Sequence, residues 1–151
     1  MTVFAGDPIL AADMNRAQQR VIGTPSVATS DATASSSTSN TLIDSITVPV
    51  EEGRRYKLST TISFSAVTAD NAFFLLLLED STSGTQLTFG TFYANVANGA
   101  STVNLWVYWT APTTGNKTFV SAQRRSGGTA TNGQAKGSGG QPRTLTLEAA
   151  D

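Results

Sequence analysis

From residue 41 onward, apolar and polar side chains alternate with a period of two, which is typical of half-buried β-strands. The segment Tyr56, Leu58, Thr60, Ile62, Phe64 and Ala66 alternates with Lys, Ser and Thr residues over about a dozen positions. This alternation predicts a strand with one face in a core and the other in water or in polar contact. The same reasoning predicts strands at 41–50, 72–79, 85–94, 101–110, 117–124 and 143–148.

Turns rich in Ser-Gly, Asn-Gly, Ala-Pro and Thr-Gly separate these strands. Short strands at this spacing predict an all-β protein, an antiparallel β-sandwich of the jelly-roll type. The Gly-rich stretch 127–140 lacks the spacing of a phosphate-binding loop. We therefore expect it to be a mobile or partner-ordered loop.

The N-terminal region differs from the rest of the chain. Residues 8–20 repeat apolar side chains at helical spacing, at Leu10, Met14 and Ala17, and so predict a short helix. The chain then divides into an N-terminal arm or helical anchor at 1–25, a Ser/Thr-rich linker or edge strand at 26–41, and a β-sandwich domain at 42–151.

Two predicted strands are apolar on both faces. Positions 73–78 hold only Phe and Leu, and in 103–109 the inward Val103, Leu105, Val107 and Trp109 alternate with outward Trp106 and Tyr108. A two-layer sandwich leaves each strand one outer face. That face is covered by the N-terminal helix, a long loop or a neighbouring subunit, and we favour a subunit in a symmetric oligomer. The interface residues would be Phe74, Leu76, Trp106 and Tyr108, unless Trp106 and Tyr108 are simply exposed aromatics without a partner.

The amino-acid composition limits the catalytic mechanisms that are open to the chain. Of 151 residues 39% are hydrophobic and 14% charged, the net charge is −1, and the chain has neither Cys nor His. These absences exclude thiolate, imidazole and Ser-His-Asp mechanisms. The carboxylates are scattered, so no glycosidase pair and no metal site is predicted. We expect no enzyme, catalytic residue or cofactor, no nucleic-acid partner and no membrane insertion. Without a signal-peptide pattern, the chain is expected to be made in the cytoplasm.

The opening Phe-Ala-Gly-Asp-Pro-Ile-Leu-Ala-Ala-Asp-Met-Asn, residues 4–15, resembles the start of small virion structural proteins of phages that infect actinobacteria, of the minor tail or tail-fibre kind. Segments 53–58, 111–120, 124–129 and 142–148 extend the resemblance over most of the chain. The ending 147–151 departs from the acidic-Gly-Pro close of many such proteins. The resemblance implies a structural protein on the virion exterior, trimeric, with an N-terminal anchor and other virion proteins as partners.

An apolar helical stripe could dock into a groove or bundle of the particle, or fold back on its own sheet. The anchor residues predicted on the first alternative are Phe4, Leu10, Met14 and Asn15.

Residues predicted to be exposed for polar contacts, including contacts with a host cell-surface glycan, are Tyr93, Asn95, Asn98, Arg124 and Arg125.

Three functions stay open. The first is a minor tail or tail-fibre component, which the shared opening motif favours. The second is a capsid decoration protein that stabilises the shell as a trimer. The third is a carbohydrate-binding or C1q-like module, against which the missing signal peptide argues.

Overall fold

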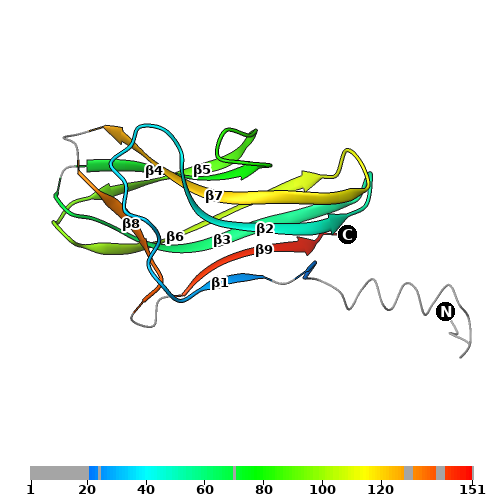
Figure 1. The fold of residues 1–151 in the computed structure, drawn as a ribbon, viewed down its shortest axis with the longest axis horizontal. Coiled ribbons are helices and arrows are strands. Elements are labelled where there is room, and N and C mark those ends of the chain that lie inside the picture. The colour runs from blue at the N-terminus through cyan, green and yellow to red at the C-terminus, as the bar shows by residue number, and fades with distance from the viewer. Residues whose placement is uncertain (1–20, 24, 70, 128–130, 139–141, 151) are drawn as a thin grey trace, which may run out of the picture.

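The computed structural model describes residues 21–150, apart from 24, 70, 128–130 and 139–141. In this part of the chain two antiparallel sheets form a β-sandwich, and no residue is helical (Figure 1). The all-β sandwich prediction is therefore confirmed. The predicted helix and the anchor residues Phe4, Leu10, Met14 and Asn15 lie outside the described residues.

The strands divide between two sheets, named sheet A and sheet B. Sheet A has the order β1 (Ser26–Ala28), β9 (Arg143–Ala149), β3 (Arg55–Ala66), β6 (Ala100–Thr110), with β8 (Gly133–Lys136) also pairing with β3. Sheet B has the order β2 (Thr41–Val50), β7 (Gly115–Gly127), β4 (Asn71–Glu79), β5 (Gln86–Ala94). The pairs β1 with β9, β2 with β7, β3 with β6 and β4 with β5 are nested inside one another along the chain.

The core lies between the sheets and follows the alternation of the sequence. On β3 the residues Leu58, Ile62 and Phe64 have no exposed surface, and on β2 Val48 and Val50 are at most 2% exposed. Each fully buried side chain of this size contributes roughly 1.5–3 kcal/mol through removal of apolar surface from water. The inward set predicted for these two strands is confirmed.

Within the Gly-rich stretch, residues 133–136 form the strand β8 and not the loop that the sequence predicts. A Cβ on Gly133 would lie 2.6 Å from Phe64 Cζ and from Phe73 Cε1. The glycine lets the β8 backbone pack directly on two core rings. The need for glycine at this position comes from tertiary packing, so it cannot be recognised in the local sequence.

Residues 29–40 stay hydrogen-bonded to the sandwich after the edge strand β1. Ala32 N donates to Ala135 O at 2.9 Å, and Arg125 N donates to Ser37 O at 2.8 Å. Asn40 Nδ2, just before β2, donates to Thr82 O at 2.7 Å. The segment is thereby fixed at its start, middle and end.

A buried ion pair connects the two sheets. Arg143 on β9 donates to both carboxylate oxygens of Asp44 on β2, at 3.0 and 3.1 Å, and the side chains are only 4% and 7% exposed. The guanidinium also donates to the carbonyl oxygens of Ser30 and Ala135. Arg143 therefore joins β2, β9, β8 and the segment after β1.

Arg143→Met is expected to destabilise the fold by about 3–5 kcal/mol, because it leaves the Asp44 carboxylate buried without its partner. Arg55→Met, on the exposed end of β3, is the matched control; it removes only the exposed contact of Arg55 with the Tyr108 ring and should change stability by about 1 kcal/mol or less. Equilibrium denaturation in urea measures both. Equal effects of the two substitutions would contradict the structural role of the pair.

A second tie is held by Asp31. Its Oδ1 accepts hydrogen bonds from the backbone N–H groups of Gly137 and Ser138, both at 3.0 Å, and its Oδ2 accepts one from Lys136 Nζ at 3.2 Å. The hydrogen bond from Gly137 is the largest of the causes that hold the pKa of Asp31 below its ordinary value of 3.8. The charged form is thus favoured in the folded state.

The hydrogen bonds of the Asp31 carboxylate make the stability of the fold depend on pH in the acid range. A depressed carboxyl pKa contributes stability that is complete above the ordinary value of 3.8 and is lost as pH falls toward the folded value. Asp31→Asn should lower the Tm at neutral pH, and its Tm should fall less steeply than that of the unaltered chain below about pH 4. Melting curves between neutral and acid pH measure this. The control is Glu52→Gln at an exposed turn; parallel profiles for all three proteins would refute the prediction.

Candidate functional site

The exposed aromatic side chains of the described residues lie on only two strands. Phe89 (53% exposed) and Tyr93 (54%) are on β5, and Trp106 (58%) and Tyr108 (47%) are on β6. These strands are consecutive in the chain and are joined by the loop 95–99. The exposed aromatic side chains of the described residues therefore belong to two strands that follow one another in the chain.

β5 and β6 also form one side of the sandwich. β5 ends sheet B and β6 ends sheet A, and the strands lie against each other, because a Cβ on Gly90 would come within 2.6 Å of Leu105 Cδ2. Neither strand contains a charged residue or proline. The edge strand β2, in contrast, contains Asp44 and Pro49, and β1 has only three residues. Natural edge strands are kept from pairing by such features, so the β5–β6 side is the unprotected one.

The outer face of sheet B carries an apolar row. Its four members lie opposite one another across the whole sheet in the order Leu42, Ala122, Leu76, Phe89. Ala122 and Leu76 have no exposed surface, whereas the terminal members Leu42 and Phe89 are 46% and 53% exposed. Phe74 packs beside the row, with its ring centroid 5.4 Å from that of Phe89. This apolar row is a continuous hydrophobic band on an outer face.

Part of this outer face is covered by the chain itself. Leu78 and Val120, next to the apolar row, are 1% and 4% exposed. The β4–β5 loop reaches over β7 toward the start of β2, where Thr82 O accepts the hydrogen bond from Asn40. A loop, one of the three alternatives predicted from the sequence, thus covers part of the outer apolar face. Leu76, predicted at a subunit interface, has no exposed surface in the single chain and cannot touch a partner while its neighbours stay in place.

Trp106 and Tyr108 lie on the other outer face, that of sheet A. Trp106 is opposite Ser59 and Tyr108 is opposite Lys57 on β3. The four residues predicted to share one interface therefore fall on two faces, Phe74 and Leu76 on sheet B and these two on sheet A. The sequence could not separate them, because the strands' assignment to different sheets is a property of the topology.

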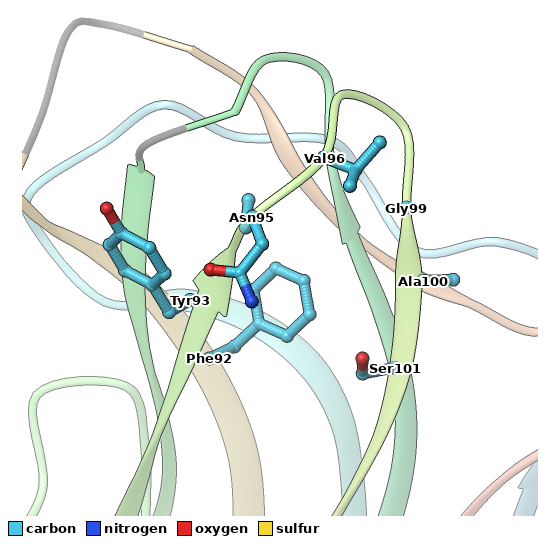
Figure 2. A pocket seen from close by; sticks show the side chains of 8 residues that line it. Phe92, Tyr93, Asn95, Val96, Gly99, Ala100 and Ser101 are labelled. Carbon is cyan, nitrogen blue, oxygen red and sulfur yellow. The ribbon is translucent and has the colours of Figure 1, made fainter.

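A shallow cavity of about 240 Å³ lies where β5 turns into β6 (Figure 2). Its lining includes Tyr93, Asn95 and Ser101, and Figure 2 shows the side chains of Tyr93 and Asn95 on the β5 side of the loop. Asn98, at the tip, is exposed and has a φ of 57°, a left-handed conformation that Asn tolerates. The structure thus groups three of the predicted surface-contact residues.

The two predicted arginine contacts are placed elsewhere. The Arg124 guanidinium lies 5.2 Å from the ring centroid of Phe74, on the outer face of sheet B. Arg125 Nε donates to Ser36 O at 3.2 Å, so this side chain helps to hold the segment before β2. Arg124 and Arg125 do not line the cavity at the β5–β6 loop.

The acidic residue at the end of β4 is also engaged within the fold. Glu79 accepts a hydrogen bond from Trp109 Nε1 at 3.2 Å and lies 2.9 Å from Lys117 Nζ. Its hydrogen bond raises the pKa of Lys117 above the ordinary value. Within the described residues no three acidic side chains gather in the manner of a metal site, and none of the described segments is a helix that could cross a membrane.

Sequence reasoning did not single out Leu42 or Phe89, the two exposed ends of the apolar row. The signal for Phe89 was available, since it lies four residues before Tyr93 and thus on the same face of a strand. Leu42 could not be assigned to the outer face from the sequence, because the register shift between Leu42 and Asp44 interrupts the alternation of inward and outward side chains on β2.

No protein-family model and no curated protein matches the chain. Solved structures with partial similarity include "CBM4 structure and function" (16% identity, TM-score 0.39, covering 70% of this chain and 59% of that one). "EclA C-terminal domain; sugar-binding protein" has 13% identity and a TM-score of 0.44, covering 82% and 75%. The VP2 subviral particle of infectious bursal disease virus has 11% identity and a TM-score of 0.39, covering 99% and 42%. At these values no function is transferred from them.

Leu76→Ala tests whether the chain covers its own outer face. Because Leu76 is fully buried, its truncation should cost about 2–5 kcal/mol, as in a core. Leu42→Ala, at the half-exposed end of the same row, should cost less than about 1 kcal/mol. Denaturation at low protein concentration measures both. Similar small costs would mean that the row is buried only by a partner.

Proposed function

We propose that this chain is a non-enzymatic structural protein of a phage virion exterior, a minor tail or tail-fibre component made in the host cytoplasm. The resemblance carried by residues 4–15 supports the virion assignment. A role in assembly is supported by one observation above all, the apolar row that crosses the outer face of sheet B with Leu42 and Phe89 exposed at its ends.

An outer sheet face that meets only water normally carries polar side chains at alternate positions. Here Phe74 and Phe89 extend a band of Leu and Ala to the edge strand β5. The buried members of the row separate its two exposed ends, Leu42 and Phe89. Large apolar side chains exposed at both edges of one outer face support a contact with another protein. The edge strand β5, which has neither a charged residue nor a proline, lies in the same region.

The partner that we propose is a second copy of the chain, in a closed trimer. The band lies on one outer face, and its two exposed ends are on the two edge strands, Leu42 on β2 and Phe89 on β5. The Phe89 end of one copy can therefore pack against the Leu42 end of the next copy around a closed ring. Trimers that bury such a band permanently have interfaces of roughly 2,000 Å² or more. Other virion proteins would be contacted through the N-terminal anchor.

We further assign the sandwich to the jelly-roll class. In support, the first strand pairs with the last, the second with β7, the third with β6, and β4 with β5 at the centre. Leaving out the short β8, this gives eight strands in two sheets of four, as in a jelly roll.

The test is the solution mass of the full-length chain, measured by light scattering after size exclusion. We expect three times the 15.8 kDa of the chain. The double variant Leu42→Ser, Phe89→Ser should run as a monomer with little loss of Tm, because both side chains are about half exposed. Val27→Ser, Val67→Ser is the matched control, with exposures of 57% and 52% away from the row.

The unaltered chain running as a monomer at all concentrations would overturn self-assembly. A double variant that keeps the trimer would place the interface away from the apolar row.

A further inference from the structure

The outer face of sheet A differs chemically from that of sheet B. Reading across the sheet, Trp106 faces Ser59 and then Thr146, while Asn104 faces Thr61 and then Thr144. Thr61 Oγ1 donates to Asn104 Oδ1 at 2.8 Å. The aromatic residues of this face thus stand among hydroxyl and amide groups. Val27 on β1, opposite Thr144, is an exposed apolar residue at the far end of the face.

Two rings form a corner at the β6 edge of this face. The ring centroids of Trp106 and Tyr108 are 5.6 Å apart and their planes meet at 73°. The Arg55 guanidinium lies 4.1 Å from the ring centroid of Tyr108, and Lys57 Nζ lies 5.9 Å from that of Trp106. Cation–π contacts of this kind hold the rings in position, while more than half of Trp106 remains exposed.

A sheet face of this composition suits a sugar chain. A sugar ring has an apolar C–H face, which stacks on an aromatic ring, and a rim of hydroxyl groups, which both donate and accept hydrogen bonds. Ser, Thr and Asn side chains offer both functions in return. A protein partner is less well matched, because burying these polar groups without a hydrogen bond for each would oppose binding.

Single-stranded nucleic acid also stacks on aromatic rings, but it needs a positively charged track. This face has Arg55 and Lys57, and Lys57 lies opposite Glu148. The whole chain has a net charge of −1. A neutral ligand therefore fits the face better than a polyanion does.

We propose that the outer face of sheet A is a binding platform for a neutral glycan chain. Trp106 is the stacking surface, Tyr108 stands as a wall beside the bound sugar, and Ser59, Thr61 and Asn104 hydrogen-bond the chain as it crosses the sheet. The biological setting, a glycan on the surface of a host cell, rests on the proposed virion function; the binding itself does not.

The experiment is affinity electrophoresis of the full-length chain through gels that contain arabinogalactan, mannan or xylan. We expect at least one polysaccharide to retard the protein. Trp106→Ala should lower the affinity about tenfold or more, and Trp106→Phe, which keeps a ring, should lower it less. Because Trp109, the second of two tryptophans, is only 9% exposed, a change of tryptophan fluorescence on binding reports Trp106.

The matched control is the double variant Leu42→Ser, Phe89→Ser, which changes the other outer face. It should lose the trimer and keep the affinity of each chain for a short oligosaccharide, read from the tryptophan fluorescence, whereas Trp106→Ala should keep the trimer and lose retardation by the polysaccharide. The two proposals therefore fail separately. Absence of retardation by all three polysaccharides, equal retardation of Trp106→Ala, or binding only to heparin or single-stranded DNA would each overturn the glycan platform.

Discussion

A two-layer sandwich has a single interior, so each strand can bury only one of its two faces there. β4 is apolar on both faces and therefore violates the usual pattern of such a fold. Its inward Phe73, Leu75 and Leu77 join the main core, while Leu76 and Leu78 form a second small cluster with Val120 and Ala122 on the outside. The returning β4–β5 loop and the apolar row both follow from the need to cover that second face.

The two outer faces surround their exposed aromatic side chains with different kinds of residue. On sheet B the exposed Phe89 continues an apolar band, and on sheet A the exposed Trp106 stands among hydroxyl groups. Burial of an aromatic ring that is surrounded by apolar side chains is favourable, because no neighbouring polar group has to be desolvated at the same time. Such a ring therefore suits a permanent interface. A ring that is surrounded by polar side chains can bind and release a ligand that forms hydrogen bonds with those side chains. Exposure alone, which is 53% and 58% for these two residues, does not distinguish them.

Most of the strands could be predicted from the sequence because β-alternation is a local property. The bounds 41–50 coincide with β2, and the inward residues of β3 were all assigned to the core. β8 escaped prediction because Gly133 is required by two distant phenylalanine rings. Phe74, Trp106 and Tyr108 were recognised from the sequence, whereas Phe89 was not. The division of these residues between two faces depends on which sheet each strand joins. The tie between Arg143 and Asp44, 99 residues apart, likewise has no local signal.

The separation of the two faces has a consequence for binding strength. An open sheet face that stacks one or two sugar rings gives weak affinity per site, because little surface is buried and the sugar gives up hydrogen bonds to water. Assembly through sheet B leaves sheet A free in every copy, so a trimer would present three platforms at fixed distances. Linked sites that engage one polymer together raise the effective concentration and can strengthen binding by about 10²–10⁴. In the proposed trimer, the apolar row would thus supply the valency that makes the proposed glycan platform bind strongly.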